Sequence, residues 1–291
     1  MATLISPAPI VPSGRFGRRP GPELTLWFSL AVLVIVILVS VLAPLIAPCD
    51  PIAQDLRDTF AAPSPQHWLG TDDLGRDVLS RMIFGTRVSI LASLLAVAIA
   101  LAIGLPIGLA AGYLGGAVDT VLMRVVDTLL AFPAIILAIG ITATLGPSIT
   151  NAMLAVGIIL SPSIARLIRA QVLSVKEQTY IEAARSFGAR GLFRMVGTHI
   201  LPNSIQPVLV QTSILMGSAL IAEATLSFLG LGVQPPDPSW GSILSRSYTF
   251  AAQAPFQIIV PGVAIAVCVF AFTTIGDKAQ ERLDPRRRRA S

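Results

Sequence analysis

The stretch VSILASLLAVAIALAIGLPIGLAA, residues 88–111, decides the fold because it is apolar apart from two serines and contains no charged side chain. A helix needs about 20 apolar residues to cross the ~30 Å hydrocarbon core of a bilayer. Inside lipid every backbone N–H and C=O must find a partner within the protein, and a continuous apolar run achieves this as a helix. Residues 88–111 therefore predict a transmembrane α-helix.

Five other segments are apolar over a comparable length. Together they predict six transmembrane helices, at about residues 24–47, 88–111, 125–145, 149–168, 206–228 and 258–275. Only 13% of the 291 residues are charged, whereas a soluble domain has about 25%. We therefore expect an all-α membrane protein, with a transmembrane domain at 24–276 between a tail at 1–23 and a basic tail at 277–291.

The basic residues indicate how the chain crosses the membrane. With the amino terminus in the cytoplasm, sixteen of the 21 Lys and Arg residues are cytoplasmic; the other five are Arg57, Arg76, Arg81, Arg87 and Arg246. This distribution satisfies the positive-inside rule. We expect a multi-pass protein of the cell membrane with both termini and the polar segment 171–205 in the cytoplasm. Because the bases flank the spans, they argue against binding to nucleic acid.

The residues needed for several kinds of chemistry are not found in the sequence. Neither lysine, Lys176 or Lys278, follows a glycine, so the chain has no Gly-Lys-Ser/Thr phosphate loop. One cysteine, Cys49, follows the first span and the other, Cys268, lies in the last, so we expect neither a disulfide nor a metal site from them. The motif His-Glu-x-x-His of zinc proteases is missing as well. We predict no catalytic residue.

Three glycines in the second span share one helix face. Gly104, Gly108 and Gly112 are each four residues apart, and this spacing of small residues lets another helix approach closely. We favour helix packing for these glycines over a direct role in binding a substrate.

The polar segment between spans four and five contains YIEAARSFGARGLFRMVGTHILPN at residues 180–203. Residues 182–187 favour a helix, and Gly188 fits a helix C-terminal stop. A second short helix is expected at about 192–200, until Pro202 breaks it. Two short helices with a bend form a rigid knob that suits force transmission. The simpler interpretation is an amphipathic helix on the lipid surface.

This segment resembles the EAA loop of ABC importer permeases, in which Glu-Ala-Ala, then Gly, then an apolar-Leu-Pro ending docks into a groove on a cytoplasmic ATPase. The matching residues are Glu182, Ala183, Ala184, Gly188, Leu201 and Pro202. The spacing from Gly188 to Pro202 is one residue longer than in the family pattern. The resemblance implies that these residues couple the chain to an ATPase.

Three more segments are similar to the dipeptide, oligopeptide and nickel branch of that family. They are GTDDLGRD at 70–77, DTLLAFP at 127–133, and AEATLSFLGLG followed by PPDPSWG between 222 and 241. Pro235, Pro236 and Trp240 predict a stiff outer ledge with an aromatic anchor for a docked protein. Candidates for polar contacts to that protein are Asp72, Asp73, Arg76 and Asp77. The alternative for these four is a solvated loop that caps the next helix.

The resemblance implies the type I importer fold and a role as one transmembrane subunit of a binding-protein-dependent ABC importer. The implied partners are a second, similar permease chain, two ABC ATPase subunits or one two-domain ATPase, an extracytoplasmic solute-binding protein and membrane lipid. Mg-ATP would be bound by the ATPases, so we expect no cofactor in this chain. By resemblance the cargo is a short peptide, with nickel, glutathione or haem as the alternatives.

Two acidic residues, Glu223 and Asp127, are candidates for the translocation path or a gate. A carboxylate inside a span is costly unless it faces a cavity or a partner, so Glu223 could line the path or carry a coupled proton. The other interpretation is a structural anchor bonded to a neighbouring helix. A proton-coupled carrier or channel using Glu223, or a membrane scaffold without transport, would be functions of a different class.

Overall fold

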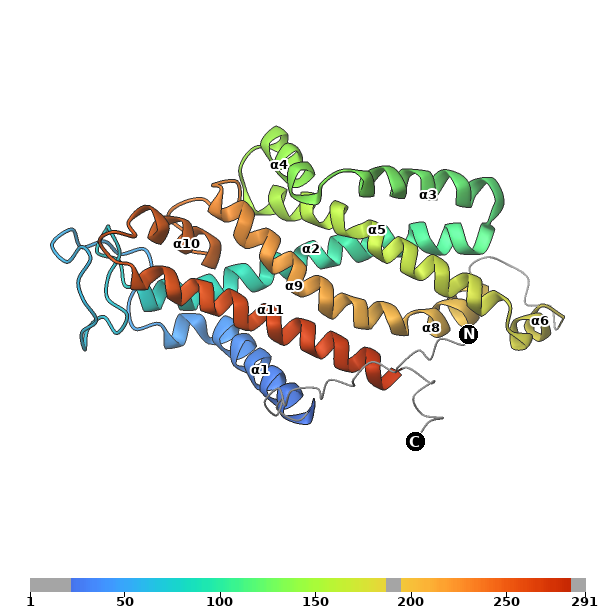
Figure 1. Cartoon of the computed structure of the whole chain (residues 1–291), viewed down its shortest axis with the longest axis horizontal. Helices are drawn as coiled ribbons and strands as arrows, with labels where there is room; N and C mark the ends of the chain where they lie inside the picture. The colour runs from blue at the N-terminus through green and yellow to red at the C-terminus, as the bar shows by residue number, and fades with distance from the viewer. Residues whose placement is uncertain (1–21, 187–194, 284–291) are drawn as a thin grey trace, which may run out of the picture.

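The computed structural model describes residues 22–186 and 195–283, which form an elongated bundle of helices (Figure 1). Five helices are long and apolar enough to cross a membrane: α1 (Pro22–Ile46), α2 (Val78–Leu114), α5 (Ile149–Lys176), α9 (Gln206–Phe228) and α11 (Phe256–Leu283). A sixth crossing is formed by α3 (Gly116–Ala131) and α4 (Ala134–Leu145) if this bent pair is counted as one span. The expected class, an all-α membrane protein, is confirmed.

The third expected span, 125–145, is not one straight helix. α3 and α4 meet at an angle of 94°. Pro133 lies between them and Phe132 is extended, with φ −89° and ψ 142°. Proline lacks the N–H that a helix needs and disfavours helical conformation in the residue before it. Apolar composition alone could not reveal this break, because the run continues through it.

α2 is longer than the apolar run that predicted it. It begins at Val78, where the Asp77 carboxylate caps the helix by accepting a hydrogen bond from Ser80 N at 2.7 Å. Aspartate is a preferred N-cap because its oxygen satisfies an N–H that lacks a partner within the helix. The first turns of α2, which contain Arg81 and Arg87, therefore extend the helix beyond the expected span of 88–111.

α5 lies at the centre of the bundle, whereas α1 and α11 lie at the periphery of the bundle. In the most apolar window of each helix, 56% of the residues are buried in α5, against 17% in both α1 and α11. α5 packs against α2 along most of its length, and α9 packs against α2, α5 and α11. The apolar faces of α1 and α11 are consequently left for lipid or another chain.

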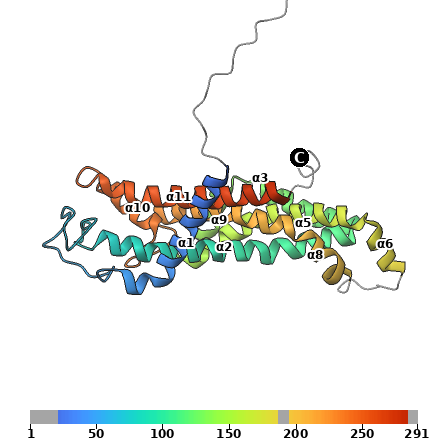
Figure 2. The ribbon, with the colours of Figure 1, turned by 90° about the horizontal axis from the view of Figure 1, so that it is seen from below.

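Several of the shorter elements lie at two opposite ends of the bundle (Figures 1 and 2). One end, here called the α6 end, holds α6 (Thr179–Ser186), a π-helical turn (Val196–Ile200) and α8 (Leu201–Ser204). The other, the loop end, holds residues 47–77 and α10 (Trp240–Thr249). The two ends carry different sets of the candidate functional residues.

Candidate functional site: helix α6, the packed glycines and the loop end

α6 is anchored on one face and exposed on the other. Ile181 is fully buried in the main apolar core, whereas Glu182 and Ala183 are exposed and Ala184 is partly buried. The helix therefore presents its Glu-Ala-Ala sequence outward from a fixed base. Gly188, also assigned to coupling, lies outside the described residues.

Leu201 and Pro202 begin α8 instead of ending a helix. The preceding π-helical turn runs directly into α8, and Pro202 occupies its first turn. Proline is common in the first turn of a helix because its fixed φ suits a helical backbone. The expected break at Pro202 is therefore wrong within the described residues, and the expected helix at 192–200 lies partly outside them.

Lys176 joins the end of α5 to the end of α2. Its Nζ donates to Gly112 O at 3.1 Å and Tyr113 O at 3.0 Å, and it lies 5.8 Å from the centre of the Tyr113 ring. A cation is favourable at a helix C-terminus, where carbonyl groups lack intrahelical partners. The contact fixes the point from which the chain continues into α6. Sequence reasoning missed it because the partners are more than 60 residues apart.

The three glycines of α2 lie against α5. A Cβ added to Gly104 would lie 2.6 Å from Ser161 O, one added to Gly108 only 1.9 Å from Ile168 Cγ2, and one added to Gly112 2.8 Å from Val172 Cβ. Contacts this short do not occur between real atoms, so the two backbones can approach this closely only without side chains. We call this contact the glycine seam.

Glu223 lies inside the packing between helices. The residue is fully buried, and its Oε1 accepts a hydrogen bond from Ser227 Oγ at 2.7 Å. The hydroxyls of Ser89 on α2 and Ser239 at the start of α10 lie beside the same carboxylate. Within the described residues, Oε2 has no hydrogen-bond partner. This placement favours the anchor interpretation of Glu223 over a position on the path.

Asp127 has a different environment. It pairs with Arg166 on α5 at 2.6 Å, and both side chains are more than half exposed. A neighbouring pair is better shielded: Arg169 donates two hydrogen bonds to the Asp119 carboxylate, at 2.5 and 2.6 Å. Both pairs tie α3 to α5. Glu223 and Asp127 are therefore not brought together into one acidic site.

The described part of the chain contains several hollows large enough to hold a small molecule, and one of about 620 Å³, mostly apolar, lies between α9, α10 and α11. An apolar pocket of about 180 Å³ lies between α4, α5 and α9, with Ile135, Val156 and Leu226 among its lining residues. A more polar pocket of about 410 Å³ opens at the loop end, where Arg76 and Arg246 contribute to its wall. The linings of these hollows include neither Glu223 nor Asp127.

The loop end is held by a cluster of charged side chains, here called the loop-end cluster: Asp72, Asp73, Arg76, Arg81 and Arg246. Asp72 accepts from Arg76 Nε at 2.8 Å and lies 3.6 Å from Arg81 Nε. Asp73 binds the guanidinium of Arg246 on α10 through two bonds, which raises the pKa of Arg246 further above its usual range. These pairs join the loop to α2 and α10.

Most of the residues predicted to dock a partner protein are buried here. Asp72, Arg76 and Asp77 are at most 8% exposed, and the side chain of Asp73 is 7% exposed. Their carboxylates and guanidinium groups form hydrogen bonds and ion pairs with neighbouring parts of the same chain. The alternative interpretation, a loop that caps the next helix, describes Asp77 correctly.

Trp240 is not a surface anchor in this structure. It is 3% exposed, its Nε1 donates to Met82 O at 3.2 Å, and its backbone N donates to Ser89 Oγ at 3.1 Å. An indole buries a large apolar area and needs one partner for its N–H, and α2 provides both. Of the predicted ledge, only Pro235 and Pro236 are exposed.

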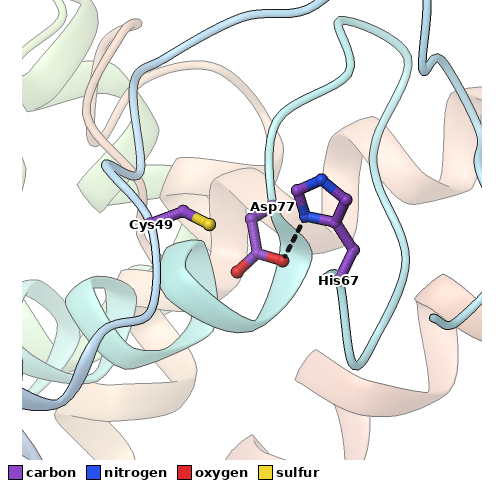
Figure 3. Close-up of side chains that lie close together, drawn as sticks. All are labelled: Cys49, His67 and Asp77. Carbon is purple, nitrogen blue, oxygen red and sulfur yellow. Dashed lines mark hydrogen bonds and ion pairs between the residues drawn. The ribbon is translucent and has the colours of Figure 1, made fainter. Parts of the chain in front are cut away.

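A second cluster at the loop end joins Cys49, His67 and Asp77 (Figure 3). Their sulfur, ring nitrogen and carboxylate oxygen lie within 4.8 Å of one another. His67 Nδ1 is 2.9 Å from Asp77 Oδ1. Burial, and then the Asp77 carboxylate, raise the pKa of the Cys49 thiol. Sequence reasoning considered only the two cysteines and overlooked this grouping.

Comparison with known proteins identifies the family. Residues 104–289 match the model of the binding-protein-dependent transport system inner membrane component, and residues 25–63 match that of the N-terminal TM domain of oligopeptide transport permease C. The chain belongs to the family of binding-protein-dependent ABC importer permeases. This permease is therefore a multi-pass component of a transport system in the inner membrane.

Curated relatives match nearly the whole permease. The dipeptide transport system permease protein DppC of Alkalihalophilus pseudofirmus is 40% identical, with 89% of this chain and 84% of the relative covered. The probable D,D-dipeptide transport system permease protein DdpC of Escherichia coli K12 is also 40% identical, over 89% and 86%. A glutathione transport system permease protein, GsiD, from Escherichia coli O6:K15:H31 is 41% identical, over 87% and 84%.

Solved structures share the fold. The inward-facing MetNI methionine ABC transporter matches with a TM-score of 0.55 at 19% identity, covering 70% of this permease and 96% of that chain. An amino acid ABC transporter matches with a TM-score of 0.50 at 22% identity, over 72% and 93%. The predicted type I importer fold is confirmed.

Proposed function

We propose that this permease forms half of a membrane path through which short peptides enter the cell, driven by ATP hydrolysis in partner subunits. The observation that carries the proposal is identity of about 40% with dipeptide permeases over almost the whole chain. A second permease chain completes the path, and two ATPase subunits, or one two-domain ATPase, bind at the α6 end. A solute-binding protein delivers the peptide at the loop end.

The geometry of α6 supports its role in coupling. Its buried Ile181 fixes the helix to the core, and exposed Glu182 is free to contact another protein. Lys176 fixes the end of α5 just before α6 begins. A displacement of α6 by an ATPase would therefore be passed to α5, and through the glycine seam to α2. In this arrangement the α6 end and both chain termini face the cytoplasm, and Mg-ATP is bound only by the partner ATPases.

The test is ATP-driven uptake of a labelled dipeptide into vesicles that contain the assembled complex. Glu182→Lys reverses the charge on the exposed face of α6 and is expected to abolish most uptake while the chain still inserts and binds the second permease. Glu281→Lys makes the same change at the end of α11 and serves as the control. Full uptake by Glu182→Lys would contradict coupling through α6.

The cargo class needs a separate measurement because a glutathione permease is as similar as the dipeptide permeases. Unlabelled dipeptide is expected to compete with the labelled dipeptide, and nickel or haem is expected not to. Stronger competition by glutathione than by unlabelled dipeptide would instead indicate that glutathione is the cargo. Uptake driven by a proton gradient without ATP, and lost in Glu223→Gln, would instead indicate a carrier.

A further inference from the structure

We propose that Cys49, His67 and Asp77 form a binding site for a borderline-soft divalent transition-metal ion such as Zn²⁺. The three residues come from separate parts of the chain: the segment after α1, the loop, and the cap of α2. Figure 3 shows the Cys49 sulfur and the His67 ring approaching the Asp77 carboxylate from two sides. The site is separate from α6, the glycine seam and the apolar pocket.

The donor set selects the class of ion. Thiolate, imidazole and carboxylate are all zinc ligands, and zinc sites with three protein ligands keep a fourth position for water. Mg²⁺ and Ca²⁺ require oxygen ligands and are not suited to a thiolate. Two other cations at the loop end, Arg76 and Arg246, are already paired with Asp72 and Asp73. Asp77 is thus not needed to neutralise them.

The distances fit a tetrahedral ion after a small adjustment. Nitrogen and oxygen ligands bonded at about 2.0–2.1 Å to a tetrahedral ion lie about 3.3 Å apart, and sulfur bonded at about 2.3 Å lies about 3.6 Å from them. His67 Nδ1 and Asp77 Oδ1 are 2.9 Å apart, so they need to separate by only a few tenths of an ångström. Cys49 Sγ, at no more than 4.8 Å, has at most about 1.2 Å to move.

Ser80 and the backbone hold the ligands in position. The backbone N of Ser80 donates to Asp77 Oδ2 at 2.7 Å, which leaves Oδ1 directed toward His67. The hydroxyl of the same serine accepts from Cys49 N at 3.0 Å. His67 is fixed through its own backbone, since Ser64 N and Gly70 N donate to His67 O. Such outer contacts orient ligands and contribute to metal affinity.

A bound ion would join the segment after α1, the loop and the start of α2 at one point. The present link between His67 and Asp77 is a single hydrogen bond, and Cys49 is connected to this site only through its backbone. The ion would therefore limit movement of α1 relative to the loop. It would act on the structure of the loop end, separately from any cargo.

The test is the rate at which Cys49 is alkylated by a maleimide in the assembled complex, resolved by mass spectrometry of the Cys49 peptide. The complex carries a tag without histidine and is first stripped with a chelator. Added Zn²⁺ is expected to slow alkylation by about tenfold or more, and Mg²⁺ is expected to leave it unchanged. An equal rate with and without Zn²⁺ would overturn the proposal.

Variants distinguish a site with three ligands from zinc binding by the Cys49 thiol alone. His67→Gln and Asp77→Asn are expected to remove the protection; asparagine still caps α2, because it is as good an N-cap as aspartate. His199→Gln changes the only other histidine in the chain and is expected to keep the protection. Protection that persists in His67→Gln would overturn the three-ligand site.

Co²⁺ gives a second, spectroscopic measurement of the site. Bound to the wild-type complex, it is expected to produce a thiolate charge-transfer band in the near ultraviolet that Cys49→Ser lacks. A wild-type spectrum identical to that of Cys49→Ser would also overturn the proposal. Both measurements are independent of peptide uptake, so their failure would leave the proposed transport function untouched.

Discussion

The glycine seam and the loop end hold the bundle together by opposite means. At the seam, the α2 backbone at its glycines packs directly against backbone carbonyls and branched apolar side chains of α5, such as those of Ile168 and Val172. At the loop end, hydrogen bonds and ion pairs connect residues more than 150 positions apart, as from Trp240 to Met82 and from Arg246 to Asp73. Membrane-embedded helices gain little from the hydrophobic effect between them, so close packing takes its place.

This difference predicts how each region tolerates substitution. The seam leaves no space for a group added to α2, because the nearest atoms are backbone carbonyls of α5 and the branched side chains of Ile164, Ile168 and Val172. A polar cluster can lose one bond and keep the others. We therefore expect the largest effects on stability at the seam and the smallest in exposed ion pairs.

Gly108→Val is expected to have the largest effect. Its Cβ would lie 1.9 Å from Ile168 Cγ2 and 2.4 Å from Ala165 O, so α2 and α5 must separate. We expect a loss of more than ~3 kcal/mol in the free energy of unfolding, or failure to assemble. Thermal unfolding in detergent measures the loss of stability. Gly140→Val in α4, where a Cβ meets nothing within 4 Å, is the control; equal stability of the two variants would contradict the role of the seam.

Trp240→Phe is expected to rank second. It removes the bond to Met82 O and part of a buried side chain, at a cost of about 1–3 kcal/mol. Trp68→Phe makes the same change at a side chain that is 70% exposed, and should cost much less. The same unfolding assay compares the two variants. A cost for Trp240→Phe no larger than for Trp68→Phe would mean that Trp240 does not stabilise the loop end.

The pair of Asp73 and Arg246 is expected to contribute less. Asp73 is 7% exposed and Arg246 36% exposed at the side chain, so solvent screens the pair in part. A double-mutant cycle with Asp73→Ala and Arg246→Ala should give a coupling energy of about 1–2 kcal/mol. A coupling energy near zero would show that the two bonds of this pair do not hold α10 to the loop.

The pair of Asp127 and Arg166 is expected to contribute least. Both side chains are more than half exposed, and exposed pairs contribute about 0.2–1 kcal/mol, less at high salt. A double-mutant cycle with Asp127→Asn and Arg166→Gln in the isolated chain measures this coupling energy. A coupling energy well above 1 kcal/mol would show that the pair is shielded from water.

The sequence was sufficient to predict the apolar segments that cross the membrane, but not the short helix α10 or how the ends of the long helices are built. Apolar runs predicted where the chain crosses the membrane, because lipid leaves the backbone few alternatives. They could not predict the bend at Pro133, where composition stays apolar although the proline interrupts the helix. Nor could they show that α2 extends back to Val78, because its first turns carry charged side chains.

The candidate sites were predicted less well because the role of each side chain depends on which residues it contacts in the folded chain. The spacing of Gly104, Gly108 and Gly112 indicated a close approach, but only the structure identifies α5 as the neighbouring helix. Trp240 was expected at the surface because it follows prolines in a polar segment, yet it is buried against α2. The grouping of Cys49, His67 and Asp77 depends on the path of the loop, which no local pattern encodes.

The separation in sequence between partners also fixes the order in which contacts become available during synthesis. Every residue of the glycine seam lies between Gly104 and Val172, so the seam can form once α5 has entered the membrane. The bonds of Trp240 and Arg246 must wait until α9 has crossed and α10 has emerged. A chain halted between α5 and α9 would therefore already contain the paired helices at the centre of the bundle, while its loop end still lacked the partners from α10.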